Sequence, residues 1–174
     1  WLTPQMDRLF QEGLPGRRRF LDRLVLALEP GHARELAAHD QATAQRNRLL
    51  ANGRPDPRWP AALGDSIARH AVAATAARLS LVARLNDEGA LAPADGFPPA
   101  RLDLLCAVEA RLRDRPALEV EDWLRDCLAR GRVEDAARGG AGMGAHRADL
   151  ALSDRVSGRP AAQASTGQQK ALLL

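Results

Sequence analysis

The segment best suited to chemistry is Ser165–Gln169, where the small residues Ser-Thr-Gly lead into an apolar helix. The first amides of a helix have no intrahelical acceptor, and together with the helix dipole they favour an anion such as phosphate. Gly167 would let that anion approach the backbone closely, because it has no side chain. The segment also fits an ordinary capping box, with Ser165 and Gln168 or Thr166 and Gln169 as the pair. From these residues alone, phosphate binding and a plain capped helix both stay open.

A second candidate is the loop Gly144–Asp149, which brings His146, Arg147 and Asp149 together just before a predicted strand. One interpretation is a site that contacts phosphate or a partner subunit. The alternative is a surface turn with a local Arg–Asp pair, which would add little to stability.

Two further features could contact nucleic acid or nucleotide. Arg17, Arg18 and Arg19 are consecutive and could neutralise DNA phosphates, but so short a charge run is usually a solvated helix face. Gln5 lies where a predicted strand passes into a short helix, so its amide could reach a magnesium-bound or nucleophilic water. An ordinary exposed glutamine is the alternative.

Several kinds of site have no signature in this sequence. It contains no GxxxxGK[ST] loop, no apolar strand ending in Asp-Glu and no Ser-His-Asp pattern. Cys106 and Cys127 lack metal-ligand spacing, so we expect no metal site and interpret both as small buried residues in a reducing compartment. The net charge of +3 is weak evidence for nucleic acid. With no secretory leader and no membrane-length apolar run, the expectation is a soluble cytoplasmic protein without a membrane partner.

Periodicity predicts a mostly helical middle between pieces of sheet. We expect the two longest helices to pack as an antiparallel hairpin. Leu28 on the helix before them and Leu85 on the second of them are expected on the apolar faces of their helices. The expected elements, in chain order, are a strand end at 1–3 with a short helix to Phe10, a helix to Leu28, helices at His32–Ala51 and Pro60–Asn86, a strand alternating through Leu102, Leu104, Cys106 and Val108, a helix from Pro116, a flexible 139–144 and a strand at 148–152.

The order of these motifs resembles the RecF family, bacterial recombination and DNA-repair ATPases related to the SMC and Rad50 group of ABC-type ATPases. Three departures from the family pattern are Ala145, where proline is more usual, Ala148, where a second acidic residue often stands, and the Gly-rich run before this loop, which is looser than usual. They put a specific role of the His146 loop in doubt. The matching pieces are residues 2–10, 17–23, 46–50, 144–150 and 164–170, of which RRRFLD and STGQQKALL are the more specific.

The resemblance implies a mostly helical α+β fold, in which a helical lid-like domain is inserted in an incomplete ABC-type ATPase head of the P-loop NTPase class. Residues 1–12 would end one ATPase lobe, 13–99 would form the lid-like domain, and 100–174 would return to the head and end in the signature motif. The Walker A loop would precede Trp1 and the Walker B acids would follow Leu174. The full-length parent would then be a weak ATPase, and this stretch would be inactive alone.

The resemblance also implies roles for the candidate residues. Ser165, Thr166, Gly167, Gln168 and Gln169 would be the signature motif, which caps the γ-phosphate of ATP held with Mg²⁺ by the other subunit. Gln5 would be a Q-loop residue, and Arg17, Arg18, Arg19, His146 and Arg147 would make DNA or interlobe contacts.

An ATP-dependent homodimer would bind duplex DNA and single-strand/duplex junctions, and would help RecO/RecR-type mediators to load RecA. Such a protein would serve DNA replication, recombinational repair and the SOS response to DNA damage. A non-enzymatic helical adaptor is one alternative. Another SMC-like ATPase head is a second, although its insertion would normally carry sustained heptads, and this middle segment is too short and irregular for them.

Overall fold

The computed structural model describes Leu9 and residues 13–53, 58–91 and 98–173. Gln5 and the strand and short helix expected before Phe10 therefore lie outside the described residues. The elements are helices α1 (Leu14–Leu28), α2 (His32–Ala51), α3 (Arg58–Leu91), α4 (Ala107–Leu112), α5 (Ala117–Arg130), α6 (Arg132–Arg138) and α7 (Thr166–Leu173), strands β1 (Ala100–Leu105) and β2 (Asp149–Asp154), and the short 3-10 helices η2 (Ala145–Arg147) and η3 (Ala161–Gln163).

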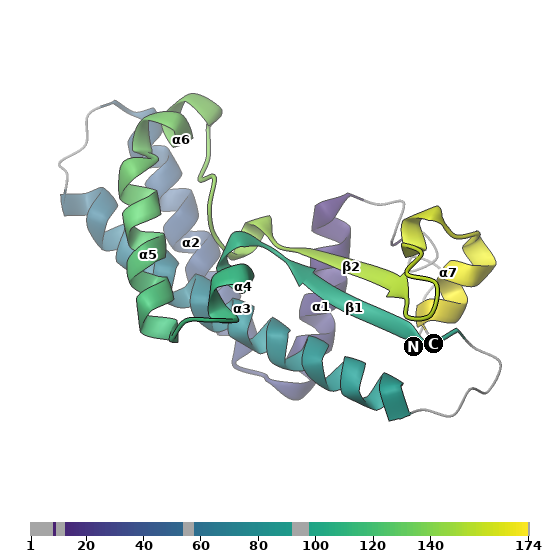
Figure 1. Ribbon diagram of the computed structural model, residues 1–174. Helices are drawn as coiled ribbons and strands as arrows, with labels where there is room; N and C mark the ends of the chain where they lie inside the picture. Colours follow the sequence, from purple (N-terminus) through teal and green to yellow (C-terminus); the bar gives the residue numbers. More distant parts are fainter. Residues whose placement is uncertain (1–8, 10–12, 54–57, 92–97, 174) are drawn as a thin grey trace.

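The long helix α3 organises the fold. At one end of the molecule it lies with α2, α5 and α6, and at the other it passes beneath β1 and β2 (Figure 1). Six residues separate α2 from α3 in the sequence, and Glu35 on α2 meets His70 on α3 at 2.7 Å. The two helices therefore form the antiparallel hairpin expected from the sequence.

Two strands make the sheet of the described residues. They are antiparallel, with Leu102 opposite Leu152 and Leu104 opposite Leu150. Leu104, Leu150 and Leu152 are buried on one face, as the alternation predicts. The free edge of β1 is covered by Asn86 of α3, whose side chain donates to the Leu102 carbonyl at 2.8 Å and accepts from the Leu102 amide at 2.9 Å.

The strand alternation does not continue through Cys106 and Val108, and that part of the prediction is wrong. β1 ends at Leu105, and the Cys106 sulfur caps α4 by accepting from the Glu109 amide at 3.3 Å. Val108 is buried on this short helix. Val108 would face inward in a strand, where side chains alternate, and also in a short helix. The sequence pattern therefore could not distinguish the two.

Two large apolar clusters form the core, and α3 contributes to both. One lies among α2, α3, α4 and α5 and includes Ile67, Ala71 and Leu124. The other lies among α1, α3 and the strands and includes Leu21 and Leu104. The helical end and the strand end are therefore packed against the same helix.

Some helix details differ from the sequence expectation. α4 and α6 were not predicted, and α3 extends beyond both ends of the expected Pro60–Asn86. Leu28 is 48% exposed and Leu85 is 36% exposed, so neither belongs to the buried core. α6 has the sequence RVEDAAR, which is too short and polar to show helical periodicity. Among the described residues, no helix combines the length and apolarity that a membrane span requires.

Candidate functional site

The Ser165 turn has the geometry of a capped helix start. The Gln168 amide donates to Ser165 Oγ at 3.3 Å, and the Ser165 amide donates to Gln168 Oε1 at 3.0 Å. This is the reciprocal capping box, so the Ser165–Gln168 alternative is confirmed. Gln169 is 5% exposed, and its amide nitrogen donates to the Ala164 carbonyl at 3.0 Å. It therefore secures the turn from inside rather than pairing with Thr166.

The outer side of this turn is open. Ser165, Thr166, Gly167 and Gln168 are all exposed. Gly167 has no positive φ, and no other atom lies within 4 Å of where its Cβ would be. Nothing in the described part of the chain therefore requires glycine here, and the space beside Gly167 is open.

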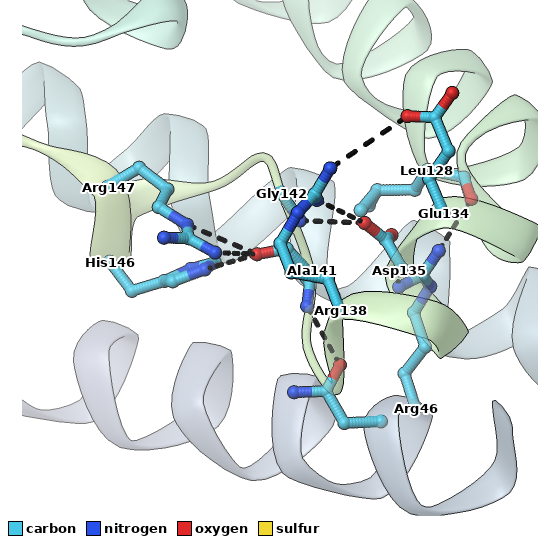
Figure 2. Close-up of polar contacts among 10 residues, drawn as sticks. Arg46, Leu128, Glu134, Asp135, Arg138, Ala141, Gly142, His146 and Arg147 are labelled. Atoms are coloured by element: carbon cyan, nitrogen blue, oxygen red, sulfur yellow. Dashed lines mark hydrogen bonds and ion pairs between the residues drawn. The ribbon is translucent and has the colours of Figure 1, made fainter. Parts of the chain in front are cut away.

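The His146 loop is tied to the helical end through one carbonyl. Figure 2 shows the Ala141 oxygen accepting from His146 Nε2 at 3.0 Å and from Arg147 Nε and Nη2 at 3.2 and 2.9 Å. The Ala141 amide donates to Asn47 Oδ1 at 3.1 Å, and the Gly142 amide to Asp135 Oδ1 at 2.8 Å. The run expected to be flexible is thus bound to α2 and α6 by hydrogen bonds from its backbone amides to side-chain oxygens.

A buried arginine supports this loop from below. Arg46 is fully buried, and its Nη2 donates to the Leu128 carbonyl at 2.6 Å (Figure 2). Its Nη1 lies 2.8 Å from Asp135 Oδ2, an ion pair whose angle falls outside hydrogen-bond geometry. Because Asp135 also accepts from Gly142, Arg46 links α2, α5 and α6 to the loop.

The local Arg147–Asp149 pair considered from the sequence is wrong. Arg147 is committed to Ala141, and Asp149 instead pairs with Arg17, at 2.7 Å from Nε and 3.0 Å from Nη2. The hydrogen bond to Asp149, opposed by a smaller burial effect, raises the pKa of Arg17. Arg17 therefore joins α1 to β2, and it is not simply part of a solvated helix face.

A second ion-pair centre was missed by sequence reasoning. Asp22 of α1 accepts from Arg78 of α3 at 2.8 and 3.0 Å and from His32 Nε2 at 2.8 Å. Arg78 also donates to the Ala145 carbonyl at 2.8 Å. The available signal was an arginine inside the apolar stripe of a long helix, since such a residue is almost never fully buried without a partner.

No group of three or more His, Cys, Asp or Glu residues within the described ranges is arranged to hold a metal. Cys106 and Cys127 are free and only partly buried, so the expectation that both are buried was too strong.

None of the protein-family models compared with the sequence matches it. Curated relatives match over the whole chain. They include the DNA replication and repair protein RecF of Mesorhizobium japonicum, at 45% identity over 175 residues, of Rhizobium rhizogenes at 44% and of Brucella abortus at 40%. The chain spans 46% of the length of each of these relatives.

Two solved structures share the fold. They are described as the recombination mediator protein RecF in the RecFOR pathway, one as RecF-ATPrS and the other as RecF-ATP. Their TM-scores are 0.80 and 0.83, over 99% and 98% of this chain and 47% and 46% of theirs. At 16% identity, these matches establish the fold alone.

Together, the helical hairpin and the small sheet define a mostly helical fold class, which the chain shares with about half of each of these RecF structures. The sequence similarity to the RecF relatives extends over every residue of the chain, so it identifies the protein more specifically than the fold class does. The chain belongs to the RecF family.

Proposed function

We propose that this chain is the lid and signature-motif part of an ATP-dependent RecF protein that acts in DNA replication and recombinational repair. The curated relatives carry that name, and the names of the two solved neighbours include ATP or ATPrS. In this proposal the lid consists of residues 13–99, and the head includes residues 1–12 and 100–174. Helices α5 and α6 of the head nevertheless pack against the lid helices α3 and α2.

The observation that carries the proposal is the open turn at Ser165–Gly167. Ser165 Oγ accepts from the Gln168 amide, which leaves its own proton available for a phosphate oxygen. The amides of Thr166 and Gly167 have no intrahelical acceptor, and nothing lies near the missing Cβ of Gly167. The residues present therefore fit a γ-phosphate brought by a second subunit. ATP bound with Mg²⁺ would supply that phosphate, and this turn would hold and orient it.

Such a turn is half of a site, because this sequence has no GxxxxGK[ST] loop. ATP would then join two heads, each offering its signature turn to the nucleotide of the other. In the proposal the dimer binds duplex DNA beside single-strand gaps and works with RecO/RecR-type mediators and RecA. Arg19 is exposed beside Arg17 and Arg18 and is the run's most accessible candidate for a phosphate contact.

The test is Ser165→Arg in the full-length protein, with Ala83→Arg on the exposed side of α3 as the matched control. Sedimentation should show ATP-dependent dimers for the wild type and the control, but not for Ser165→Arg. ATP binding to each monomer should be retained in all three. Dimers that persist in Ser165→Arg would overturn the trans role, and a wild type that never dimerises with ATP would favour a non-enzymatic adaptor.

A further inference from the structure

A pocket of about 500 Å³ lies between α1 and α2, away from the Ser165 turn. Its volume is within the range of small-molecule sites. The charged and titratable residues that line it are predominantly basic. They include Arg18, Arg19 and Arg23 of α1, Arg78 of α3, and His39 and His146.

Three of these arginines have no carboxylate partner among the described residues. Both oxygens of Asp22 are engaged by Arg78 and His32, and Asp40 pairs with His39. Arg18, Arg19 and Arg23 are in no described ion pair, and Arg18 makes one long contact, 3.5 Å to the Ala148 carbonyl. Burial and the neighbouring Arg78 charge lower the pKa of Arg18. Among the described lining residues, positive charge is thus in excess, and an anion would offset it.

Two histidines also line the pocket, His39, which is buried, and His146, which is partly buried. The His39 Nδ1–H is directed at Asp40 Oδ1, 3.1 Å away, and the His146 Nε2–H at the Ala141 carbonyl, 3.0 Å away. Since both acceptors require a donor, the tautomers leave His39 Nε2 and His146 Nδ1 without protons. Both atoms are buried and have no hydrogen-bond partner in the described structure. The rings are close, with centroids 5.4 Å apart.

We infer that this pocket binds a phosphate group, held by Arg18, Arg19 and Arg23 with the two histidines behind it. The planar guanidinium group of arginine donates paired hydrogen bonds, which match the oxygens of phosphate better than other side chains do. A metal cation is disfavoured, since it would meet the charges of Arg18 and Arg78. The phosphate can belong to a free nucleotide or to a DNA backbone, and the chemistry of the pocket is the same for both.

Anion binding should be linked to proton uptake. Burial, with smaller effects from neighbouring charges, lowers the pKa of His39 and of His146. An anion in the pocket would raise both pKa values, so affinity should increase as the solution is acidified. Besides one another, the groups facing the two rings are Arg18, Arg19, Asp22 and Arg23 from α1, Asp40 from α2, Arg78 from α3 and Arg147 from η2.

The experiment is calorimetric titration of the full-length protein with inorganic phosphate, in the presence of saturating ADP and Mg²⁺ to occupy a nucleotide loop. Arg18→Gln should weaken phosphate binding about tenfold or more, since it removes charge-assisted hydrogen bonds. Arg84→Gln is the matched control, because Arg84 is exposed on α3 and does not line the pocket. It should bind like the wild type. Equal affinities for Arg18→Gln and the wild type, or no binding by the wild type, would overturn the inference.

The pH arm uses sulfate, because phosphate itself titrates near neutral pH. Sulfate affinity should increase on acidification in the wild type and much less in His39→Gln. A wild-type affinity that does not change with pH would overturn the role of the histidines.

A competition experiment then identifies the molecule that carries the phosphate. Displacement of phosphate by a nucleoside monophosphate indicates a free nucleotide, and displacement only by a short duplex indicates a DNA backbone. The inference needs no ATP-driven dimer, so it can fail while the proposed function holds.

Discussion

Asp22 on α1 and Arg78 on α3 form a two-point ion pair, with Nε–Oδ1 and Nη2–Oδ2 distances of 2.8 and 3.0 Å. His32 of α2 donates to the same carboxylate, and Arg78 also donates to the Ala145 carbonyl before β2. Burial acts to raise the pKa of Asp22, but the hydrogen bonds from His32 and Arg78 outweigh it and hold the pKa below its ordinary value. Helices α1, α2 and α3 and the His146 loop therefore meet at one charged centre.

Removing one partner of this centre should be strongly destabilising. Arg78→Met should lower the free energy of unfolding by about 3–5 kcal/mol, because the buried carboxylate of Asp22 loses its main counter-charge. Urea unfolding of the full-length protein measures this. Arg69→Met changes an exposed residue of the same helix and should stay within about 0.5 kcal/mol of the wild type. Similar losses in both variants would contradict a special role for Arg78.

Acidification should destabilise the fold through the two histidines. Their pKa values lie below 6.5 in the folded state, chiefly because of burial. The unfolded chain therefore binds more protons just below pH 6.5, so stability is retained above that pH and declines as the pH falls through it. Unfolding at pH 7.5 and 5.5 in phosphate-free buffer should show the decline. In His39→Gln the decline should be smaller, and an unchanged decline would exclude His39 as a source.

Gly144 should not tolerate a side chain. Its φ is +136°, and a Cβ would lie 2.9 Å from His39 Nε2 and 3.0 Å from His146 Nδ1. Backbone strain of this kind costs about 1–3 kcal/mol before the histidines are displaced, so Gly144→Ala should lower the thermal midpoint by several degrees. Gly140→Ala is the control, because its Cβ would meet only Asn47 Nδ2 at an ordinary 3.5 Å. Equal midpoints for the two variants would contradict this prediction.

Gln168 should act on ATP-driven dimerisation through the cap, if the proposed function holds. Gln168→Ala removes the acceptor of the Ser165 amide and should destabilise the turn by about 1 kcal/mol, weakening dimers roughly fivefold. Glutamate also serves as the third residue of a capping box, but it adds negative charge beside the phosphate. We therefore expect Gln168→Glu to dimerise less than the wild type only at low salt. Analytical ultracentrifugation across ATP concentrations measures this. Dimerisation by Gln168→Ala at the wild-type level would exclude a role for the cap.

Periodicity predicted the long elements because their burial is one-sided over many turns. The bounds of α2 agree with the expected His32–Ala51, and the capping box was legible as Ser165-x-x-Gln168. The short helices α4 and α6 could not be found, since one or two turns contain too few residues to define a period. Tertiary packing stabilises them, through Val108 in the core of the helical end and Asp135 against Arg46.

The sequence by itself predicted the helical hairpin, the location of each strand, the Ser165–Gln168 capping box and the likeness to RecF. Each of these depends on neighbours along the chain or on motif order. Only the tertiary structure decided that Arg17 pairs with Asp149, that Arg78 meets Asp22, and that His39 faces His146 beside Gly144. These partners are separated by 132, 56 and 107 positions. A single sequence carries no signal for such pairings, because they arise when α3 and the strands bring distant segments together.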